Sequence, residues 1–331
     1  MNDLVGAVLT RPSIESAAAT DVLARHWGIA AALRPLPSER DRNFAVVVDG
    51  AERYVLKVSN GAEDRGFLEL QHDAMRRLAA ASVPCQLAVP TRGGAEILDI
   101  GSPDRPSLAR LLTWLPGRPL AEIPPADRPP ELLADLGRAM GRTVVALAEF
   151  DHPAAHRRFQ WAAEEGLEVV AAHAPALTDP PRAGLLDRWR ARLAPLAAAW
   201  PHLRHGVIHN DANDHNVLVA ASGTAISGLL DLGDAVWSVR VNELAVAAAY
   251  AALDAPDPLA TIDIVRSGFE EALPLEPAER GVLLELVALR LATSVALSAH
   301  QSSLAPDDPY LTVSEAPAWA LLAILEQEPI P

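Results

Sequence analysis

Residues 205–219, HGVIHNDANDHNVLV, and residues 229–234, LLDLGD, are the part of this sequence that is most informative about its fold. An apolar run from 217 to 220 follows a polar loop, and a second run from 225 to 230 ends on a carboxylate. Between the two runs lies Ser222-Gly223, a dipeptide typical of a turn. The pattern predicts two short strands joined as a hairpin, with a loop dense in His, Asp and Asn at one end of it.

This hairpin returns the chain, and it therefore places Asp231 beside the loop that contains Asp211 and Asn216. Phosphoryl transfer from a nucleotide needs a carboxylate to accept the proton of the attacking hydroxyl, and hard oxygen ligands for magnesium. The spacing H-x-D-x-x-x-x-N from His209 to Asn216 has the kinase interval between base and metal-binding asparagine. The pattern predicts Asp211 as the base, with Asn216 and Asp231 as Mg²⁺ ligands. His209 is expected to structure the loop by hydrogen bonding.

Two other interpretations fit parts of this pattern. A loop rich in Asp and Asn often serves only as a turn, because these side chains cap their own backbone. A divalent-metal hydrolase is the enzymatic alternative, and it predicts binding of soft or borderline metals without nucleotide. Its candidate ligands are His205, His209, Asp211, His215 and Asp231.

Residues 208–216 resemble the Brenner-type motif of the aminoglycoside phosphotransferases and their small-molecule kinase relatives. Asp231-Leu232-Gly233 stands for the Asp-Phe-Gly of protein kinases. Within that superfamily, the motif looks most like the hydroxylysine-kinase branch. One departure is Asn210, which replaces the glycine of the wider family's H-G-D and leaves the backbone path of the loop open.

The resemblance implies an α+β, protein-kinase-like fold with two lobes. A small N-lobe over residues 1–113, with an antiparallel sheet and one long helix, is expected to cover the nucleotide. A hinge over residues 114–118 is expected to lead into a larger, mainly helical C-lobe over residues 119–331, which carries the catalytic residues and binds the acceptor. The length agrees with two lobes, because 331 residues that are 50% hydrophobic exceed one usual core.

Composition narrows the class of protein further. The single cysteine, Cys85, has no partner for an internal disulfide, which favours a reducing compartment. No basic segment followed by an apolar core marks a signal peptide, and the longest apolar run, residues 244–253, is short for a membrane span. The net charge of −15 argues against nucleic-acid or anionic-membrane partners. We expect a soluble cytoplasmic protein, of an oligomeric state that the sequence does not indicate.

The Asp49-Gly50 pair predicts a hairpin between the apolar run 45–48 and the run 53–58. A polar turn over a hairpin with a lysine on its second strand is the layout of a kinase phosphate-covering loop. Lys57 is therefore predicted to pair with the α- and β-phosphates, against the simpler interpretation of an exposed strand lysine. The covering loop has no glycine, so its phosphate contacts are left open among Ser38, Arg40 and Asn43.

Apolar residues at helical spacing predict a long helix over residues 62–81. Kinase-like folds need a carboxylate on this helix to hold the lysine in place. Gln71 occupies the position that the resemblance gives to this glutamate, and Glu69, two residues away, faces another direction. The sequence leaves open which of the two partners Lys57.

Two more strands are expected near residues 95–99 and 107–114, and residues 112–117 resemble the hinge between the lobes. A nucleobase needs a flat apolar slot beside an exposed backbone edge, and a strand stopped by Pro-Gly offers one. Trp114 and Leu115 are therefore predicted to contact the nucleotide, although a plain strand-ending turn fits the residues equally well.

The remaining chain is predicted to be mainly helical. Helices are expected from residue 131, after Trp161, over residues 185–199, 259–272 and 280–300, and through Trp319. Trp161 is expected in the core. Glu243 matches in position an acidic residue that braces the catalytic loop in relatives, and the same role is expected here.

ATP is expected as the donor with Mg²⁺, and the hydroxylysine-kinase resemblance implies that GTP serves as well or better. The same resemblance points to a small hydroxylated amine or amino acid as acceptor, whose ammonium needs an anionic or aromatic partner. Candidate partners are Asp214, Glu243, Tyr310, Glu315 and Trp319. Aminoglycosides are the alternative acceptors, followed by homoserine and choline-like alcohols. A nucleotide-binding pseudokinase is the non-enzymatic alternative, and the presence of Lys57 with the loop residues counts against it.

Overall fold

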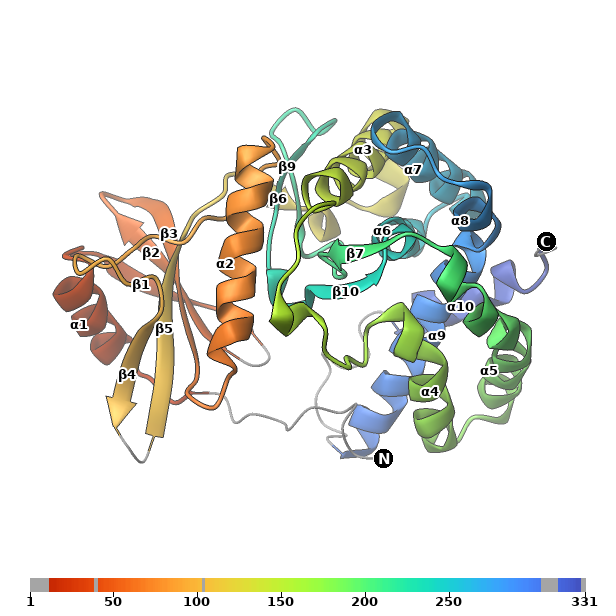
Figure 1. The fold of residues 1–331 in the computed structure, drawn as a ribbon, viewed down its shortest axis with the longest axis horizontal. Coiled ribbons are helices and arrows are strands. Elements are labelled where there is room, and N and C mark those ends of the chain that lie inside the picture. Colours follow the sequence, from red (N-terminus) through yellow and green to blue (C-terminus); the bar gives the residue numbers. More distant parts are fainter. Residues whose placement is uncertain (1–11, 39–40, 103–104, 305–314, 329–331) are drawn as a thin grey trace. The chain divides into compact units, whose positions relative to one another are not determined.

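The computed structural model describes residues 12–38, 41–102, 105–304 and 315–328 (Figure 1). The chain divides into two compact units, Gly6–Pro116 and Gly117–Pro331. The hinge expected over residues 114–118 spans this division. The assignment of nucleotide covering to the first unit and catalysis to the second stays a prediction.

The N-terminal unit is built on one antiparallel sheet of five strands in the order β1-β2-β3-β5-β4. The strands are β1 Ala32–Leu36, β2 Arg42–Val48, β3 Ala51–Asn60, β4 Leu98–Ser102 and β5 Arg105–Thr113. Asp49 and Gly50 join β2 to β3 with φ angles of 50° and 79°, in the left-handed region that a tight hairpin turn needs. The hairpin predicted from this dipeptide is confirmed.

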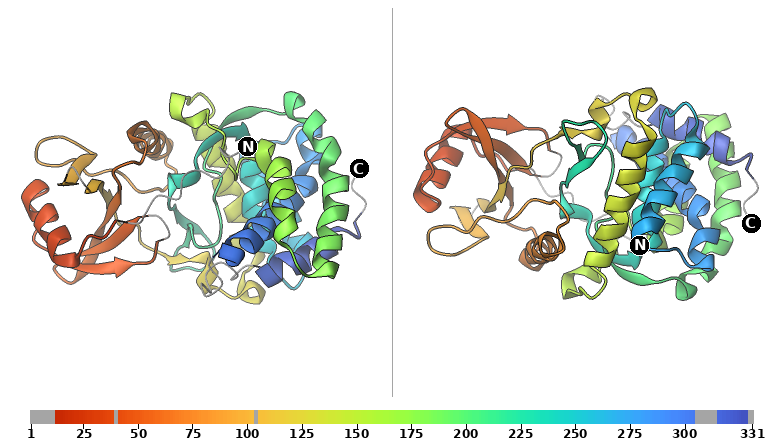
Figure 2. Two further views of the ribbon diagram at one scale, coloured as in Figure 1. Left: turned by 90° about the horizontal axis from the view of Figure 1, so that it is seen from below. Right: turned by 90° about the horizontal axis from the view of Figure 1, so that it is seen from above.

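Two helices cover the two faces of this sheet, α1 Ser16–His26 and α2 Arg65–Ala80 (Figures 1 and 2). Leu23 of α1 packs with Leu56 and Leu111, while Leu68 of α2 packs with Leu108 on the opposite face. Side chains alternate along a strand, so residues 57 and 110 share the face with Leu108. This alternation places Lys57 beneath α2.

The C-terminal unit is mainly helical. Its helices are α3 Pro130–Ala146, α4 Ala163–His173, α5 Pro180–Leu193, α6 Val241–Ala252, α7 Pro258–Ala272, α8 Pro277–Gly281, α9 Leu283–Leu304 and α10 Glu315–Leu325. Its strands form two small sheets, β6-β8-β9 and β10-β7. They are β6 Arg118–Pro119, β7 His205–Ile208, β8 Val217–Val219, β9 Ile226–Leu229 and β10 Val236–Val239.

Helices α3 and α7 lie side by side (Figure 2), and two glycines permit their close approach. A Cβ on Gly137 would lie 1.8 Å from the carbonyl oxygen of Val265, and one on Gly268 would lie 1.9 Å from that of Ala134. Either side chain would push the helices apart, because the obstacle is backbone. The site strands β8 and β9 are anchored to this pair, since Asp135 of α3 accepts a hydrogen bond of 2.7 Å from the Ile226 N–H.

The α+β class predicted from the sequence is confirmed, and the differences lie in the bounds and number of individual helices and strands. The helix predicted over residues 185–199 instead spans Pro180–Leu193 and gives way to a 3-10 turn at Ala194–Ala198, because Pro195 lacks the N–H that would continue it. Strands β1, β7 and β10 and the buried helix α6 were not predicted. Helix α9 is long and apolar enough over Leu283–Ser302 to cross a membrane, but 72% of its most apolar part is buried within the fold.

Candidate active site

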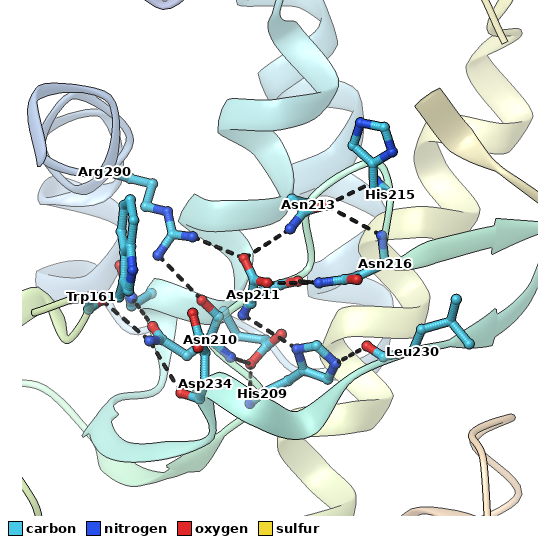
Figure 3. A network of polar contacts seen from close by, with 12 residues as sticks. Trp161, His209, Asn210, Asp211, Asn213, His215, Asn216, Leu230, Asp234 and Arg290 are labelled. Atoms are coloured by element: carbon cyan, nitrogen blue, oxygen red, sulfur yellow. Dashed lines mark hydrogen bonds and ion pairs between the residues drawn. The ribbon is translucent and has the colours of Figure 1, made fainter. Parts of the chain in front are cut away.

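The ends of three strands deliver the residues of the polar loop (Figure 3). β7 ends directly before His209, β8 starts directly after Asn216, and β9 ends two residues before Asp231. Leu230 ties these ends together, because its N–H donates to the Asn216 carbonyl at 2.8 Å and its carbonyl lies 2.8 Å from His209 Nε2. The hairpin thus brings Asp231 beside the loop, as the sequence predicts.

His209 holds this loop through both ring nitrogens. The Leu230 carbonyl can only accept a hydrogen bond, so Nε2 of His209 is the donor in this contact. Nδ1 then accepts from the backbone N–H of Asp211 at 3.3 Å. A ring engaged at both nitrogens favours the loop-structuring role predicted for His209 over acid–base work.

Asn210 has a φ of 66°, in the left-handed region that favours glycine and that asparagine tolerates best among other residues. This conformation accounts for asparagine at the glycine position of H-G-D. The buried side chain also adds contacts, because its Nδ2 donates to the Trp161 carbonyl at 3.2 Å and its Oδ1 accepts from Asn242 at 2.9 Å. The backbone path that the sequence left open is therefore fixed from both the main chain and the side chain.

Glu243 of α6 is fully buried beneath the loop. Its Oε2 accepts hydrogen bonds from the backbone N–H groups of His209 at 2.7 Å and Asn210 at 3.1 Å. The bracing contact predicted for this residue is confirmed. Burial raises the pKa of the Glu243 carboxyl, opposed by the nearby His209 and by the two N–H donors.

Three donors surround the carboxylate of Asp211 (Figure 3). Oδ1 accepts from Asn213 Nδ2 at 2.9 Å and from Arg290 Nη2 at 3.0 Å, while Oδ2 accepts from Asn216 Nδ2 at 2.7 Å. Burial, with a further contribution from Asp234, raises the pKa of Asp211 to about 8, against the opposing charge of Arg290. The arrangement orients one carboxylate at the tip of the loop, as a proton acceptor requires.

The oxygen atoms near Asp211 suit a hard divalent cation. Asn216 turns its amide nitrogen toward Asp211, and its amide oxygen therefore faces away from that carboxylate. Asp231 has a φ of 57° and caps a 3-10 turn, Leu232–Asp234, through a hydrogen bond of 3.0 Å from the Gly233 N–H. Amide and carboxylate oxygens are the ligands that magnesium prefers. Asn216 and Asp231 therefore carry oxygen atoms of the kind that binds Mg²⁺, and their roles as metal ligands stay predictions.

The hydrolase alternative requires a cluster of His and Asp ligands. In the described parts of the chain, no group of three or more His, Cys, Asp or Glu side chains is placed to hold a metal ion. His205 instead lies 3.2 Å from Glu164, and His215 is exposed. The five proposed ligands do not form one site.

In the N-terminal unit, Lys57 is 7% exposed, so the interpretation as an exposed strand lysine is wrong. Its Nζ lies 3.8 Å from Asp41 Oδ2, and the same oxygen lies 4.0 Å from Nη2 of Arg110. Gln71 accepts a hydrogen bond of 2.9 Å from Arg110, and Glu69 is exposed. Lys57 thus lies near a carboxylate of the segment before β2.

The other residues predicted to bind nucleotide lie in the same unit. Asn43 faces Lys57 across the β2–β3 ladder, and its buried Oδ1 has no hydrogen-bond partner among the described residues. Ser38 Oγ accepts from the Asp41 N–H at 3.2 Å. Trp114 and Leu115, both half-buried, follow the end of β5, with the Trp114 N–H donating to the Arg53 carbonyl. Arg40 lies outside the described residues.

Several residues that were candidates for binding the ammonium group of the acceptor substrate already have partners in the protein. Asp214 lies 3.7 Å from Arg128, and Glu315 accepts hydrogen bonds from Arg182 at 2.5 Å and from Trp319 at 3.3 Å. Tyr310 lies outside the described residues. These contacts favour structural roles for Asp214 and Glu315.

Arg290 of α9, which lies 79 residues beyond Asp211 in the sequence, was not predicted to contact it. One signal was available, because Arg290 is the single charged residue between Leu286 and Leu297, in a mainly apolar part of the helix. A buried arginine in such a run requires an anionic partner. Neither the spacing nor the motif identified that partner.

The fold and this site together define a phosphotransferase with a protein-kinase-like architecture. The Phosphotransferase enzyme family matches residues 32–281, and the chain belongs to this family. It is an enzyme that transfers a phosphoryl group to an alcohol group.

Sequence relatives cover nearly the whole chain. The hydroxylysine kinase of Bos taurus is 31% identical over 338 residues, which cover 94% of this chain and 89% of the relative. The hydroxylysine kinase of Danio rerio is also 31% identical, over 92% of this chain and 89% of the relative. Among solved structures, a microcompartment-associated aminopropanol kinase has a TM-score of 0.72 at 18% identity and covers 95% of this chain and 97% of its own.

Proposed function

We propose that this enzyme transfers the γ-phosphate of ATP or GTP to the hydroxyl of a small, amine-bearing metabolite, a hydroxylysine-like amino alcohol. The observation that carries the proposal is the Asp211 carboxylate, held by three donors at the tip of a loop beside Asp231. The names of the sequence relatives, hydroxylysine kinases over nine-tenths of the chain, support the acceptor class.

Each polar residue has a proposed task in this reaction. Asp211 accepts the proton of the attacking hydroxyl, or orients that hydroxyl in a transition state that demands little early proton abstraction. Lys57 pairs with the α- and β-phosphates. Asn216 and Asp231 hold Mg²⁺, which when bound neutralises charge on the phosphates. The proposed compartment is the cytoplasm.

ATP ranks slightly ahead of GTP as the proposed donor on the breadth of the family. Turnover with each nucleotide at limiting concentration decides between them. A tenfold preference corresponds to about 1.4 kcal/mol of discrimination between the two bases.

A screen of nucleoside-diphosphate release tests the acceptor. Hydroxylysine, other amino alcohols, homoserine, choline and several aminoglycosides are offered with ATP and GTP in parallel. We expect turnover with the small amino alcohols, highest with hydroxylysine. Turnover restricted to aminoglycosides would establish the second candidate, which a solved aminoglycoside phosphotransferase with a TM-score of 0.62 at 18% identity supports at the level of fold alone.

A further inference from the structure

Arg290 is a buried cation in an apolar helix, and the proposed reaction has so far assigned it no task. It is 5% exposed. Its guanidinium carbon lies 4.3 Å from the centre of the Trp161 ring and 5.6 Å from that of Tyr250. Aromatic faces stabilise a desolvated cation, and here they also limit where the guanidinium can move.

The guanidinium bridges two points of the catalytic loop (Figure 3). Nη2 donates to Asp211 Oδ1 at 3.0 Å, and Nη1 donates to the Asn210 carbonyl at 3.4 Å. One rigid fork therefore contacts both the reactive carboxylate and the backbone directly before it. A lysine carries a single nitrogen and cannot keep both contacts in this geometry.

Arg290 is also the charged donor among the three that hold Asp211. Asn213 and Asn216 are neutral amides, whereas a charged donor forms a stronger hydrogen bond with a carboxylate. Asp234 adds negative charge near both Asp211 and Arg290. Without the guanidinium, the carboxylate would face this neighbouring charge with only amide partners.

We propose that Arg290 is a positioning residue for phosphoryl transfer, which fixes the orientation of the Asp211 carboxylate from helix α9. The inference rests on the proposed role of Asp211 in that transfer. In this role, Arg290 contacts neither the nucleotide nor the acceptor. Loss of the guanidinium should therefore lower kcat and leave both binding steps nearly unchanged.

Two substitutions test this positioning role. Arg290→Met keeps the length and apolar stem of the side chain, and it should lower kcat on the order of a hundredfold, as expected for a misplaced catalytic group. Arg290→Lys restores the charge without the fork and should recover part of this loss. In both variants the acceptor KM and the nucleotide Kd should change by less than about threefold.

Arg240 provides the matched control. Its guanidinium donates to the carbonyls of His205 at 2.7 Å and Ala148 at 2.8 Å, and neither contact reaches Asp211. Arg240→Met should lower the melting temperature while kcat stays near that of the wild type. A merely structural role for Arg290 predicts the same behaviour in Arg290→Met.

A crystal structure of Arg290→Met gives a second readout that does not require turnover. The Asp211 carboxylate should rotate away from Asn213, because Oδ1 has lost its charged donor. An unmoved carboxylate overturns the inference, and so does a kcat within threefold of wild type in Arg290→Met. Wild-type enzyme that turns over no acceptor in the screen would count against the proposed function instead, and the crystal structure would still decide the role of Arg290.

Discussion

Glu243 Oε2 accepts a hydrogen bond of 2.7 Å from the backbone N–H of His209, across 34 residues of sequence. The same oxygen accepts from the next N–H, that of Asn210. Burial of a carboxylate costs free energy unless the group is well hydrogen-bonded, and Glu243 is fully buried. A different path of the loop would break these hydrogen bonds and is therefore disfavoured. Helix α6 thereby determines where the loop leaves β7.

Replacement of Glu243 should lower the free energy of unfolding, and the loss should be larger when the new side chain cannot accept hydrogen bonds. Glu243→Leu leaves two buried N–H groups without an acceptor, at a cost of about 1–3 kcal/mol for each group. Glu243→Gln retains an amide oxygen and should lose less. Urea unfolding of the three proteins measures the free-energy differences. Equal stability of the Leu and Gln variants would show that the two hydrogen bonds contribute little.

Substitutions at Asn210 should reverse the usual preference for alanine over glycine. The φ of 66° strains any residue with a Cβ, and both substitutions remove the same side-chain hydrogen bonds. Asn210→Gly should therefore be more stable than Asn210→Ala by about 1 kcal/mol. Asn242, its hydrogen-bond partner in helix α6, is the control, and there Ala should be the more stable of the two. The same order at both positions would contradict the conformational explanation.

The proposed roles of Asp211 as proton acceptor and Asp231 as metal ligand predict different defects in their variants. Asp211→Asn should keep Mg-nucleotide binding nearly intact and lower turnover by orders of magnitude, because it removes the proton acceptor. Asp231→Ala should weaken the binding of Mg-nucleotide itself, because it removes a metal ligand. Calorimetric titration separates the two effects. Equal loss of nucleotide affinity in both variants would show that the roles are wrongly assigned, and tight zinc binding without nucleotide would favour the hydrolase.

His72 of α2 predicts a pH dependence of stability. Burial, with a further contribution from the charge of Arg110, lowers the pKa of His72 to about 4, although Glu96 lies 3.2 Å away and opposes the shift. The unfolded chain binds this proton below about pH 6.5, before the folded protein does. The neutral histidine therefore contributes stability that is complete above pH 6.5 and is lost as the pH falls toward 4.

His72→Gln lacks this titration, so its loss of stability between pH 7 and pH 5 should be smaller than that of the wild type by about 2 kcal/mol. Denaturant unfolding at the two pH values gives both differences. Other groups that titrate in this range affect both proteins alike, which makes the wild type the reference. Parallel pH dependences would show that the pKa of His72 is the same in the folded and unfolded protein.

Local patterns predicted much of this fold. The Asp49-Gly50 dipeptide determines a hairpin without help from the rest of the chain, and the polar residues from His209 to Asn216 mark the loop between β7 and β8. The long helix predicted over residues 62–81 differs from α2 by three residues at its start, where Asp64 caps it through the Gly66 N–H. Signals of this kind are carried by residues adjacent in sequence.

Contacts between distant residues were not predictable in this way. Nothing in the sequence connects Gln71 with Arg110, yet the two side chains form a hydrogen bond, whereas the sequence left open whether Gln71 or Glu69 partners Lys57. Helix α6 is almost uniformly buried and therefore shows no amphipathic period to mark it as a helix. Arg290 reaches Asp211 because α9 lies against the loop between β7 and β8, and the spacing of residues in the sequence does not predict that packing.

The contacts of two aromatic rings with Arg290 predict discrimination against quaternary ammonium acceptors. A quaternary ammonium such as that of choline has no N–H to donate, so its recognition depends on open aromatic faces. The rings of Trp161 and Tyr250 already contact the guanidinium of Arg290. Choline should therefore be a poor acceptor, with a kcat/KM at least about a hundredfold below that of hydroxylysine, a difference of about 2.7 kcal/mol in transition-state binding. Ethanolamine, which has the same hydroxyl and a primary ammonium, is the matched comparison, and it should exceed choline. Choline turnover equal to that of ethanolamine would mean that another aromatic surface binds the cation.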